Sequence, residues 1–156
     1  MPEPVQHRTA DAGLRNIENE DFRPELTRNL VVDGYNVCRG AGPVMGRDLQ
    51  PEELVRELAR YRKRYGGRVI VIFDASGSLR GISLRQGGGE VRYSKSLKRS
   101  DRADDDIKQL VKTLTGTVIV VTSDGRLRES LRSRGVRSVR SNWFLARHLL
   151  PKKGSD

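Results

Sequence analysis

Residues 29–36 read Asn-Leu-Val-Val-Asp-Gly-Tyr-Asn, and this octapeptide is the clearest structural signal in the chain. Its apolar centre lacks polar alternation, which is typical of a strand covered on both faces in a parallel sheet. The run ends abruptly at Asp33, and we expect Gly34 to let the backbone turn sharply just beyond the strand. Asp33 is therefore predicted at the carboxyl edge of a buried strand, where open α/β sheets place their ligand crevices.

Two later stretches repeat this pattern. Residues 68–74 read Arg-Val-Ile-Val-Ile-Phe-Asp, and residues 117–124 read Thr-Val-Ile-Val-Val-Thr-Ser-Asp. Each contains a short run rich in β-branched residues and ends in an aspartate. Three such strands in one parallel sheet would bring Asp33, Asp74 and Asp124 to the same edge.

Amphipathic segments alternate with these strands. Residues 51–65 and 101–114 carry apolar side chains at the three- and four-residue spacing of a helix. This alternation implies βαβ units, so we predict an α/β fold with helices on both faces of a central, mostly parallel sheet. Further short elements are expected as helices over residues 126–134 and 142–150 and as strands over residues 90–93 and 136–139.

The domain organisation is simple, because 156 residues suit one domain with a sizeable core. Residues 1–28 are polar and lack a clear period, so we predict an N-terminal extension that is partly disordered. Residues 29–150 form the predicted domain, and residues 151–156 form a polar tail. Within the domain, the glycine-rich residues 37–49 are expected to be loop with at most a short helix.

The composition limits the classes of partner and of chemistry. A formal net charge of +10 favours a polyanion such as RNA, although a merely soluble basic protein remains the plain alternative. Cys38 is the only cysteine, which excludes an internal disulfide and fits the reducing cytoplasm. No apolar run approaches the ~20 residues of a membrane span, so no membrane partner is expected. His7 and His148 lie at opposite ends of the chain, which argues against a His-based zinc site or triad.

A fourth acidic position lies at the start of the second predicted long helix. Residues 101–107 read Asp-Arg-Ala-Asp-Asp-Asp-Ile. At ~100° per residue, Asp104 lies on one border of the apolar stripe, Asp106 lies farther out on the other border, and Asp105 points away. Asp104 is therefore best placed to face the sheet edge. The alternative is that these acids cap the helix and favour its positive end.

Carboxylates that converge at one edge repel each other unless a cation neutralises them. Mg²⁺ and similar hard ions take oxygen ligands. We therefore expect Asp33, Asp74, Asp104 and Asp124 to bind Mg²⁺ or Mn²⁺ for phosphodiester cleavage. The sequence does not distinguish between one bound ion and two. For each strand-end aspartate, the alternative is that it caps the turn or helix that follows.

Other side chains are expected to support this centre. Asn36 could orient Asp33 or a metal-bound water, and the alternative is an ordinary cap. Ser123 could bind a carboxylate or a phosphate, and the alternative is a hydroxyl that stabilises its own turn. Tyr35 could stack on a base, although packing beside the first strand is favoured. Either a solvated surface or a ring of contacts to RNA phosphates would explain the surrounding cations. These are Arg80, Arg85, Arg92, Lys95, Lys98, Arg99, Arg102, Arg126 and Arg128.

These motifs together resemble the NYN domain, a member of the PIN-like nuclease group. The resemblance is carried, in order and spacing, by residues 32–37, 71–75, 103–107 and 121–124. The chain is similar to the YacP-like branch, typified by a bacterial ribosome-associated endoribonuclease, over about residues 30–150. The Arg- and Gly-rich residues 76–89 and the N-terminal extension depart from the family pattern.

The resemblance implies a PIN-like three-layer α/β/α sandwich and Mg²⁺- or Mn²⁺-dependent cleavage of RNA. It also implies metal-binding acids at Asp33, Asp74, Asp104 and Asp124, with Asn36 in support. Ribosome-associated mRNA is then one possible substrate, and oligomeric state stays open.

We therefore expect a metal-dependent endoribonuclease, a hydrolase of phosphodiester bonds. The first alternative is a non-catalytic RNA- or ribosome-binding module on the same fold, which would be expected to lack one of the four acids; all four are present. The second is a phosphate-ester hydrolase or phosphotransferase with an aspartate nucleophile. That chemistry favours Asp-x-Asp directly after the first strand, whereas Gly34 and Tyr35 follow Asp33 here.

Overall fold

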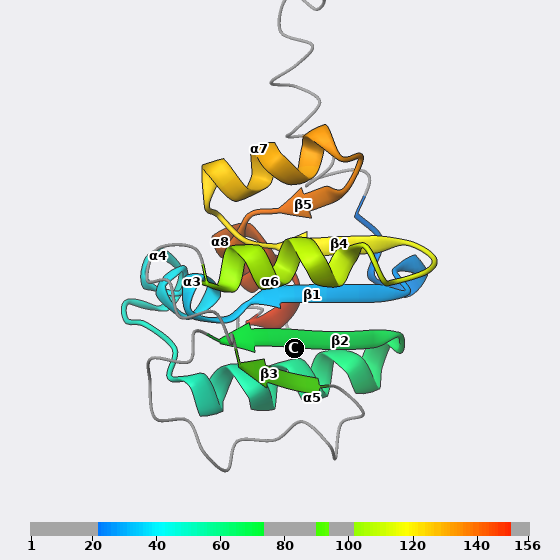
Figure 1. Cartoon of the computed structure of the whole chain (residues 1–156). Helices are drawn as coiled ribbons and strands as arrows, with labels where there is room; N and C mark the ends of the chain where they lie inside the picture. The colour runs from blue at the N-terminus through cyan, green and yellow to red at the C-terminus, as the bar shows by residue number, and fades with distance from the viewer. Residues whose placement is uncertain (1–21, 74–89, 94–101, 151–156) are drawn as a thin grey trace, which may run out of the picture.

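The computed structural model describes residues 22–73, 90–93 and 102–150, without the side chains of residues 93 and 102–104. Its centre is a five-stranded sheet in the order β3-β2-β1-β4-β5, and every neighbouring pair is parallel (Figure 1). The predicted α/β fold with a central parallel sheet is thus confirmed. The strands are β1 (Asn29–Asp33), β2 (Arg68–Phe73), β3 (Glu90–Tyr93), β4 (Val118–Val121) and β5 (Arg137–Val139).

Helices cover both faces of this sheet and make three layers (Figure 1). In the segment predicted as loop, two short helices form instead, and the last predicted helix begins one residue earlier and changes to π-helical pitch at Leu145. The helices are η2 (Pro24–Leu26), α3 (Gly34–Arg39), α4 (Gly42–Met45), α5 (Pro51–Tyr65), α6 (Arg102–Val111), α7 (Gly125–Ser133), α8 (Ser141–Phe144) and η4 (Leu145–Leu149).

Each central strand is buried on both faces, which explains its unbroken apolar sequence. In β1, Leu30 and Val32 belong to one core with α3, α5, α8 and η4, whereas Val31 belongs to a second core with α6 and α7. Side chains two residues apart share a face of a strand. Asp33 therefore extends the row of Val31, on the side of α6 and α7.

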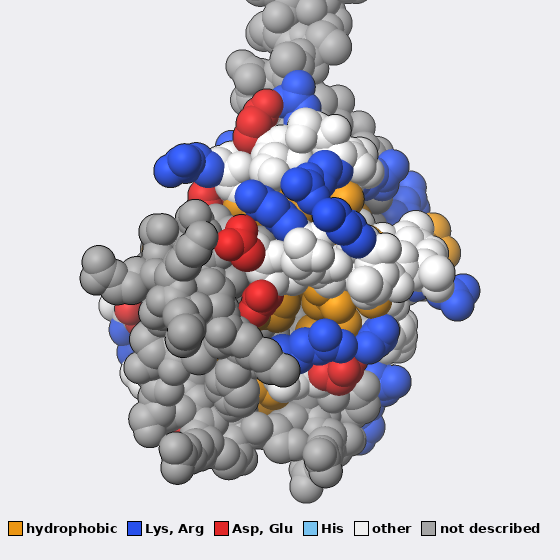
Figure 2. Space-filling model, viewed as in Figure 1, with side chains coloured by type: hydrophobic (Ala, Val, Ile, Leu, Met, Phe, Trp, Pro, Cys, Tyr) orange, Lys and Arg blue, Asp and Glu red, His pale blue; other side chains and the backbone are white. Residues whose placement is uncertain are grey.

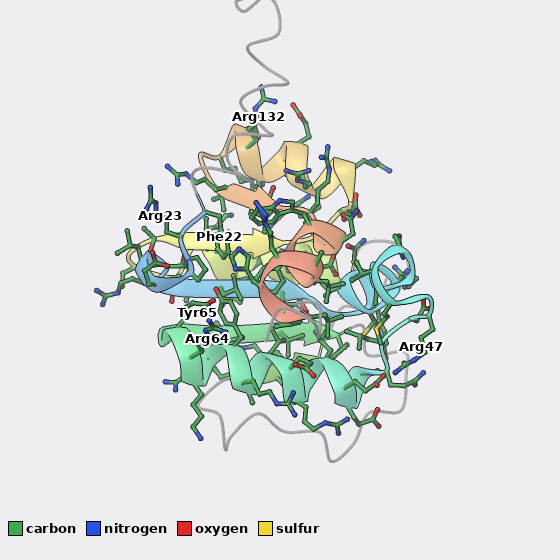
Figure 3. All side chains as sticks on the ribbon, turned by 180° about the vertical axis from the view of Figure 1, so that it is seen from behind. Phe22, Arg23, Arg47, Arg64, Tyr65 and Arg132 are labelled. Atoms are coloured by element: carbon green, nitrogen blue, oxygen red, sulfur yellow. The ribbon has the colours of Figure 1, made fainter. Side chains whose placement is uncertain are left out.

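The last residues of the predicted N-terminal extension pack against this domain. Phe22 is buried, and its ring meets those of Trp143 and His148 edge to face (Figure 3). The Arg28 N–H donates to Thr117 Oγ1 at 2.8 Å. Residues 1–21 and the tail at 151–156 lie outside the described part, so the expected disorder there stays a prediction. No helix among the described residues is long and apolar enough to cross a membrane.

Candidate active site

Asp33 lies at the carboxyl end of the central strand, and its side chain faces the neighbouring strand. It is 7 % exposed, and Thr122 Oγ1 donates a hydrogen bond to its Oδ2 at 2.8 Å. The parallel register pairs Val32 with Val121, so the next residues, Asp33 and Thr122, lie side by side. Asp33 also occupies the N-cap position of α3, yet its side chain makes no capping hydrogen bond to that helix. The capping alternative therefore fails at Asp33.

The Thr122 hydroxyl connects two of the predicted acids. It donates to Asp33 and accepts the backbone N–H of Asp124 at 3.1 Å. Because a backbone N–H can only donate, the single hydroxyl proton is directed to Asp33. Thr122 is fully buried, and the sequence analysis did not select it. Its one signal was a polar residue that closes a run of valine and isoleucine.

Asp124 caps the helix that follows it, as the alternative interpretation predicted. Its Oδ1 accepts the N–H groups of Arg126 at 2.9 Å and Leu127 at 3.2 Å, at the first turn of α7. Within the described part of the chain, its Oδ2 makes no hydrogen bond. One carboxylate oxygen therefore stabilises the helix while the other stays available for a ligand.

Asn36 holds the segment that carries Asp124. Its Oδ1 accepts the Ser123 N–H and the Ser141 hydroxyl, each at 2.7 Å, and the Ser123 hydroxyl accepts the Ser141 N–H at 2.9 Å. The Ser123 N–H requires an acceptor, which fixes the amide orientation and turns the NH₂ group of Asn36 away. Asn36 thus joins α3 to the segment before α7 and to α8. The Ser123 hydroxyl therefore bonds to a residue 18 positions farther along the chain, and not within its own turn as the alternative assumed. Ser141 was not anticipated.

Gly34 is required because a side chain would not fit at this position. The expected reason, a sharp turn of the backbone, does not apply. The φ angle of Gly34 is not positive, but an added Cβ would lie 2.5 Å from a Phe73 ring carbon and 2.8 Å from the Ile72 carbonyl oxygen. Only a residue without a side chain lets α3 begin this close to β2. The next residue, Tyr35, packs edge to face on Phe73 with ring centroids 5.1 Å apart, so its predicted packing role is confirmed.

Two predicted ligands have side chains outside the described part. Asp74 follows Phe73, the last residue of β2, and Asp104 lies in α6. Farther along α6, Asp105 is exposed and Asp106 is half-buried, as the helix geometry predicted. Among residues 22–73, 90–93 and 102–150, no group of three or more His, Cys, Asp or Glu side chains is arranged to hold a metal ion. The described part of the site therefore contains Asp33 and Asp124.

One predicted RNA contact is wrong. Arg128 is buried, and its Nε donates to Ser138 Oγ at 3.0 Å, so its guanidinium joins α7 to β5 instead of facing solvent. Arg126 is exposed at the start of α7, as a phosphate contact requires. Figure 2 shows Lys and Arg side chains gathered over α6 and α7. Arg92, on β3, is exposed and contacts Glu90 at 3.3 Å. The other predicted contacts have side chains outside the described residues: Arg80, Arg85, Lys95, Lys98, Arg99 and Arg102.

Neither Cys38 nor His148 is suited to supply a nucleophile or a base. Burial raises the pKa of the Cys38 thiol to about 12, so this side chain stays protonated at neutral pH. Burial, with the nearby Arg147, lowers the pKa of His148 to about 4. His148 therefore stays neutral within its aromatic cluster. Among the described residues, the polar groups at the carboxyl edge of the sheet remain the candidate site.

Known proteins share this architecture. A family model for the YacP-like NYN domain matches residues 30–149. The chain is 32 % identical over 104 residues to "Uncharacterized protein YacP" of Bacillus subtilis (strain 168), a match that covers 61 % of this chain and 59 % of that relative. The alignment thus spans less than two thirds of the relative's length.

Two crystal structures extend this likeness. Rae1 (YacP) from Bacillus subtilis superposes with a TM-score of 0.60 and 29 % identity, over 74 % of this chain and 70 % of that one. Its W164L mutant gives a TM-score of 0.58 and 26 % identity, over 76 % and 73 % of the two chains. The NYN domain is a nuclease-type fold. The family match, the parallel sheet and the acids at its carboxyl edge agree: the chain belongs to the YacP-like NYN domain family.

Proposed function

We propose that the protein is a metal-dependent endoribonuclease that cleaves phosphodiester bonds of RNA. The observation that carries this proposal is the buried Asp33 carboxylate, which Thr122 holds and α3 does not use. A carboxylate held this way at the ligand-binding edge of an α/β sheet suits catalysis better than structure.

The donor set fits Mg²⁺ or Mn²⁺, because carboxylate oxygens are the ligands that such hard ions prefer. Asp33 and the open oxygen of Asp124 would hold the ion, and Asp74 and Asp104 stay predicted ligands. When bound, such an ion lowers the pKa of a water and neutralises charge that develops on the phosphate.

The chain's own residues contribute position and charge. The Thr122 hydroxyl fixes Asp33 and the backbone of Asp124, and Asn36 fixes the intervening Ser123. Arg126, exposed next to Asp124, can contact an RNA phosphate. The net charge of +10 raises the local concentration of RNA. Ribosome-associated mRNA in the cytoplasm is the substrate that the family resemblance favours.

A cleavage assay tests this proposal. Labelled RNA is incubated with Mn²⁺ or with EDTA, and the wild type is compared with Asp33→Asn and with Asp105→Asn, an exposed neighbour of equal charge. We expect internal cleavage that needs Mn²⁺, is lost in Asp33→Asn and is kept in Asp105→Asn. Absent cleavage, or equal cleavage in Asp33→Asn, would overturn the assignment.

One observation favours a second function, RNA binding without cleavage. Asp124, unlike Asp33, already has a structural role as the cap of α7. If the RNA affinity is salt-sensitive and unchanged by both substitutions while no cleavage occurs, the binding module is the better description.

A further inference from the structure

A pocket of about 540 Å³ lies beside the proposed active site, on the same face of the sheet as Asp33. Ile72 lies in its floor and is the direct register partner of Asp33 on the adjacent strand. Arg92, on the next strand, is the partner of Ile72. Because neighbouring strands are about 4.8 Å apart, the pocket begins one strand from Asp33 and extends to a second. Its volume lies in the range of ~300–1,000 Å³ that is typical of small-molecule sites.

The pocket has an apolar floor and a polar rim. Ile72 and Leu110 supply aliphatic surface, and the rim carries the guanidinium of Arg92, the carboxylate of Asp106 and the amide of Gln109. Figure 2 shows the apolar surface between α6 and the β2–β3 side of the sheet, with cationic side chains below it. A flat ring with hydrogen-bonding edges matches this arrangement, since its faces need apolar contact and its edge needs polar partners.

We propose that this pocket takes one base of the RNA substrate and prefers guanine; the inference rests on the proposed function. An ionised carboxylate only accepts hydrogen bonds. Guanine is the one common RNA base with two adjacent donors, N1–H and the N2 amino group, on its Watson–Crick edge. Adenine, cytosine and uracil each place an acceptor beside the donor that would face Asp106, which repels the carboxylate.

Arg92 complements the same base. Guanine presents the acceptors O6 and N7 on its other side, the pair that guanidinium groups bind most often. Arg92 Nη2 also contacts Glu90 at 3.3 Å, which orients the guanidinium. A guanidinium carries five N–H donors, so this contact leaves donors for a base. The carboxylate on α6 and the guanidinium on β3 thus select the two edges of one ring.

Binding in EDTA tests the inference apart from cleavage. The full chain is titrated, by fluorescence anisotropy, into labelled oligouridines that carry a single central guanosine or adenosine. We expect the guanosine RNA to bind about tenfold tighter, as one good bidentate contact allows. Asp106→Asn should reduce this preference to about twofold or less. Asp105→Asn removes the same charge from the exposed face of α6 and should keep the preference.

The ratio of the two affinities is the readout, because either substitution also raises overall RNA affinity by removing a negative charge. Equal affinities for both RNAs, or equal loss of preference in both variants, would overturn the guanine pocket. Metal-dependent cleavage without base preference would leave the proposed function standing and end the pocket alone. A guanosine preference in a protein that never cleaves RNA would support the guanine pocket and overturn the proposed function.

Discussion

Two Asp-Gly steps of this chain lie at the starts of helices that follow strands, and they behave differently. Asp33 and Gly34 lead directly from β1 into α3, whereas Thr122 and Ser123 separate Asp124 and Gly125 from the end of β4. The first aspartate is buried and bonded across the sheet, and the second caps its helix. The first glycine has Phe73 against it. For the second, no atom of the described residues outside its own helix lies within 4 Å of an added Cβ.

The difference teaches that the connection, and not the dipeptide, decides the role. With no spacer, α3 starts against the sheet, so its first residue must be glycine. The Asp33 carboxylate accepts the Thr122 hydroxyl and makes no capping hydrogen bond to α3. Two spacer residues lift α7 clear of the strand end, which leaves room for an ordinary Asp cap.

The largest expected effect concerns catalysis. Asp33→Asn keeps an acceptor for Thr122 but loses the charge. If Asp33 holds a metal ion as proposed, cleavage should fall at least about a thousandfold, because such an ion would supply several kcal/mol of transition-state stabilisation. Asp124→Asn retains an N-cap and should lose a comparable factor only if the open oxygen of Asp124 is a ligand. Single-turnover cleavage rates in Mn²⁺ measure both. Full activity in Asp124→Asn would reduce that residue to a cap.

The two glycines give the next contrast. Gly34→Ala forces a methyl group against Phe73 and the Ile72 carbonyl and should lower the free energy of unfolding by about 2–3 kcal/mol. Gly125→Ala has open space and helical φ and should be neutral or stabilising by up to about 1 kcal/mol. Urea unfolding of the two variants supplies the comparison. Similar values for both would show that α3 moves away from β2 at no cost.

The Thr122 hydroxyl bonds to both Asp33 and the backbone of Asp124, so its removal should affect the positions of both residues. Thr122→Val deprives Asp33 of a donor and the Asp124 N–H of an acceptor, at a cost of about 1–2 kcal/mol in stability. Cleavage should fall about 10–100-fold, as for groups that orient metal ligands. Thr122→Ser keeps the hydroxyl and should recover most of both losses. Urea unfolding and cleavage rates, measured on each variant, separate packing from hydrogen bonding.

The smallest effect isolates the cap itself. Asp124→Ala should destabilise the protein by about 1 kcal/mol, and Asp124→Ser, which still caps, by a few tenths. Asp33→Ser should not gain stability from capping, because the Asp33 side chain makes no capping hydrogen bond to α3. Thermal unfolding at neutral pH, without added metal, compares the three variants. Equal destabilisation by Asp124→Ala and Asp124→Ser would mean that α7 does not depend on this hydrogen bond.

Much of the fold was predictable because its signals are local. Strands buried on both faces must be apolar throughout, and the helix over Pro51–Tyr65 was bounded correctly by Pro51 at its start and glycines at its end. The positions of Asp33 and Asp124 followed from the common carboxyl edge of parallel strands.

The remaining features depend on register between distant segments. Thr122 meets Asp33 across 89 positions of sequence, and Ser141 meets Asn36 across 105. Arg128 looked like a surface cation, and only the placement of β5 beside α7 shows that Ser138 binds it. Gly34 looked like a turn residue, and its neighbour Phe73 became visible only when β2 was in place.

The hydrogen bonds from Ser141 to Asn36 and Ser123 have a consequence for biosynthesis. A chain emerges from the ribosome with its N-terminus first. The serine that holds the Asp124 segment therefore emerges with α8, after all four predicted acids have been translated. A nascent chain that displays Asp33, Asp74 and Asp104 would still lack an ordered site. For the proposed RNA cleavage, this order of synthesis would delay activity until Ser141 has been translated.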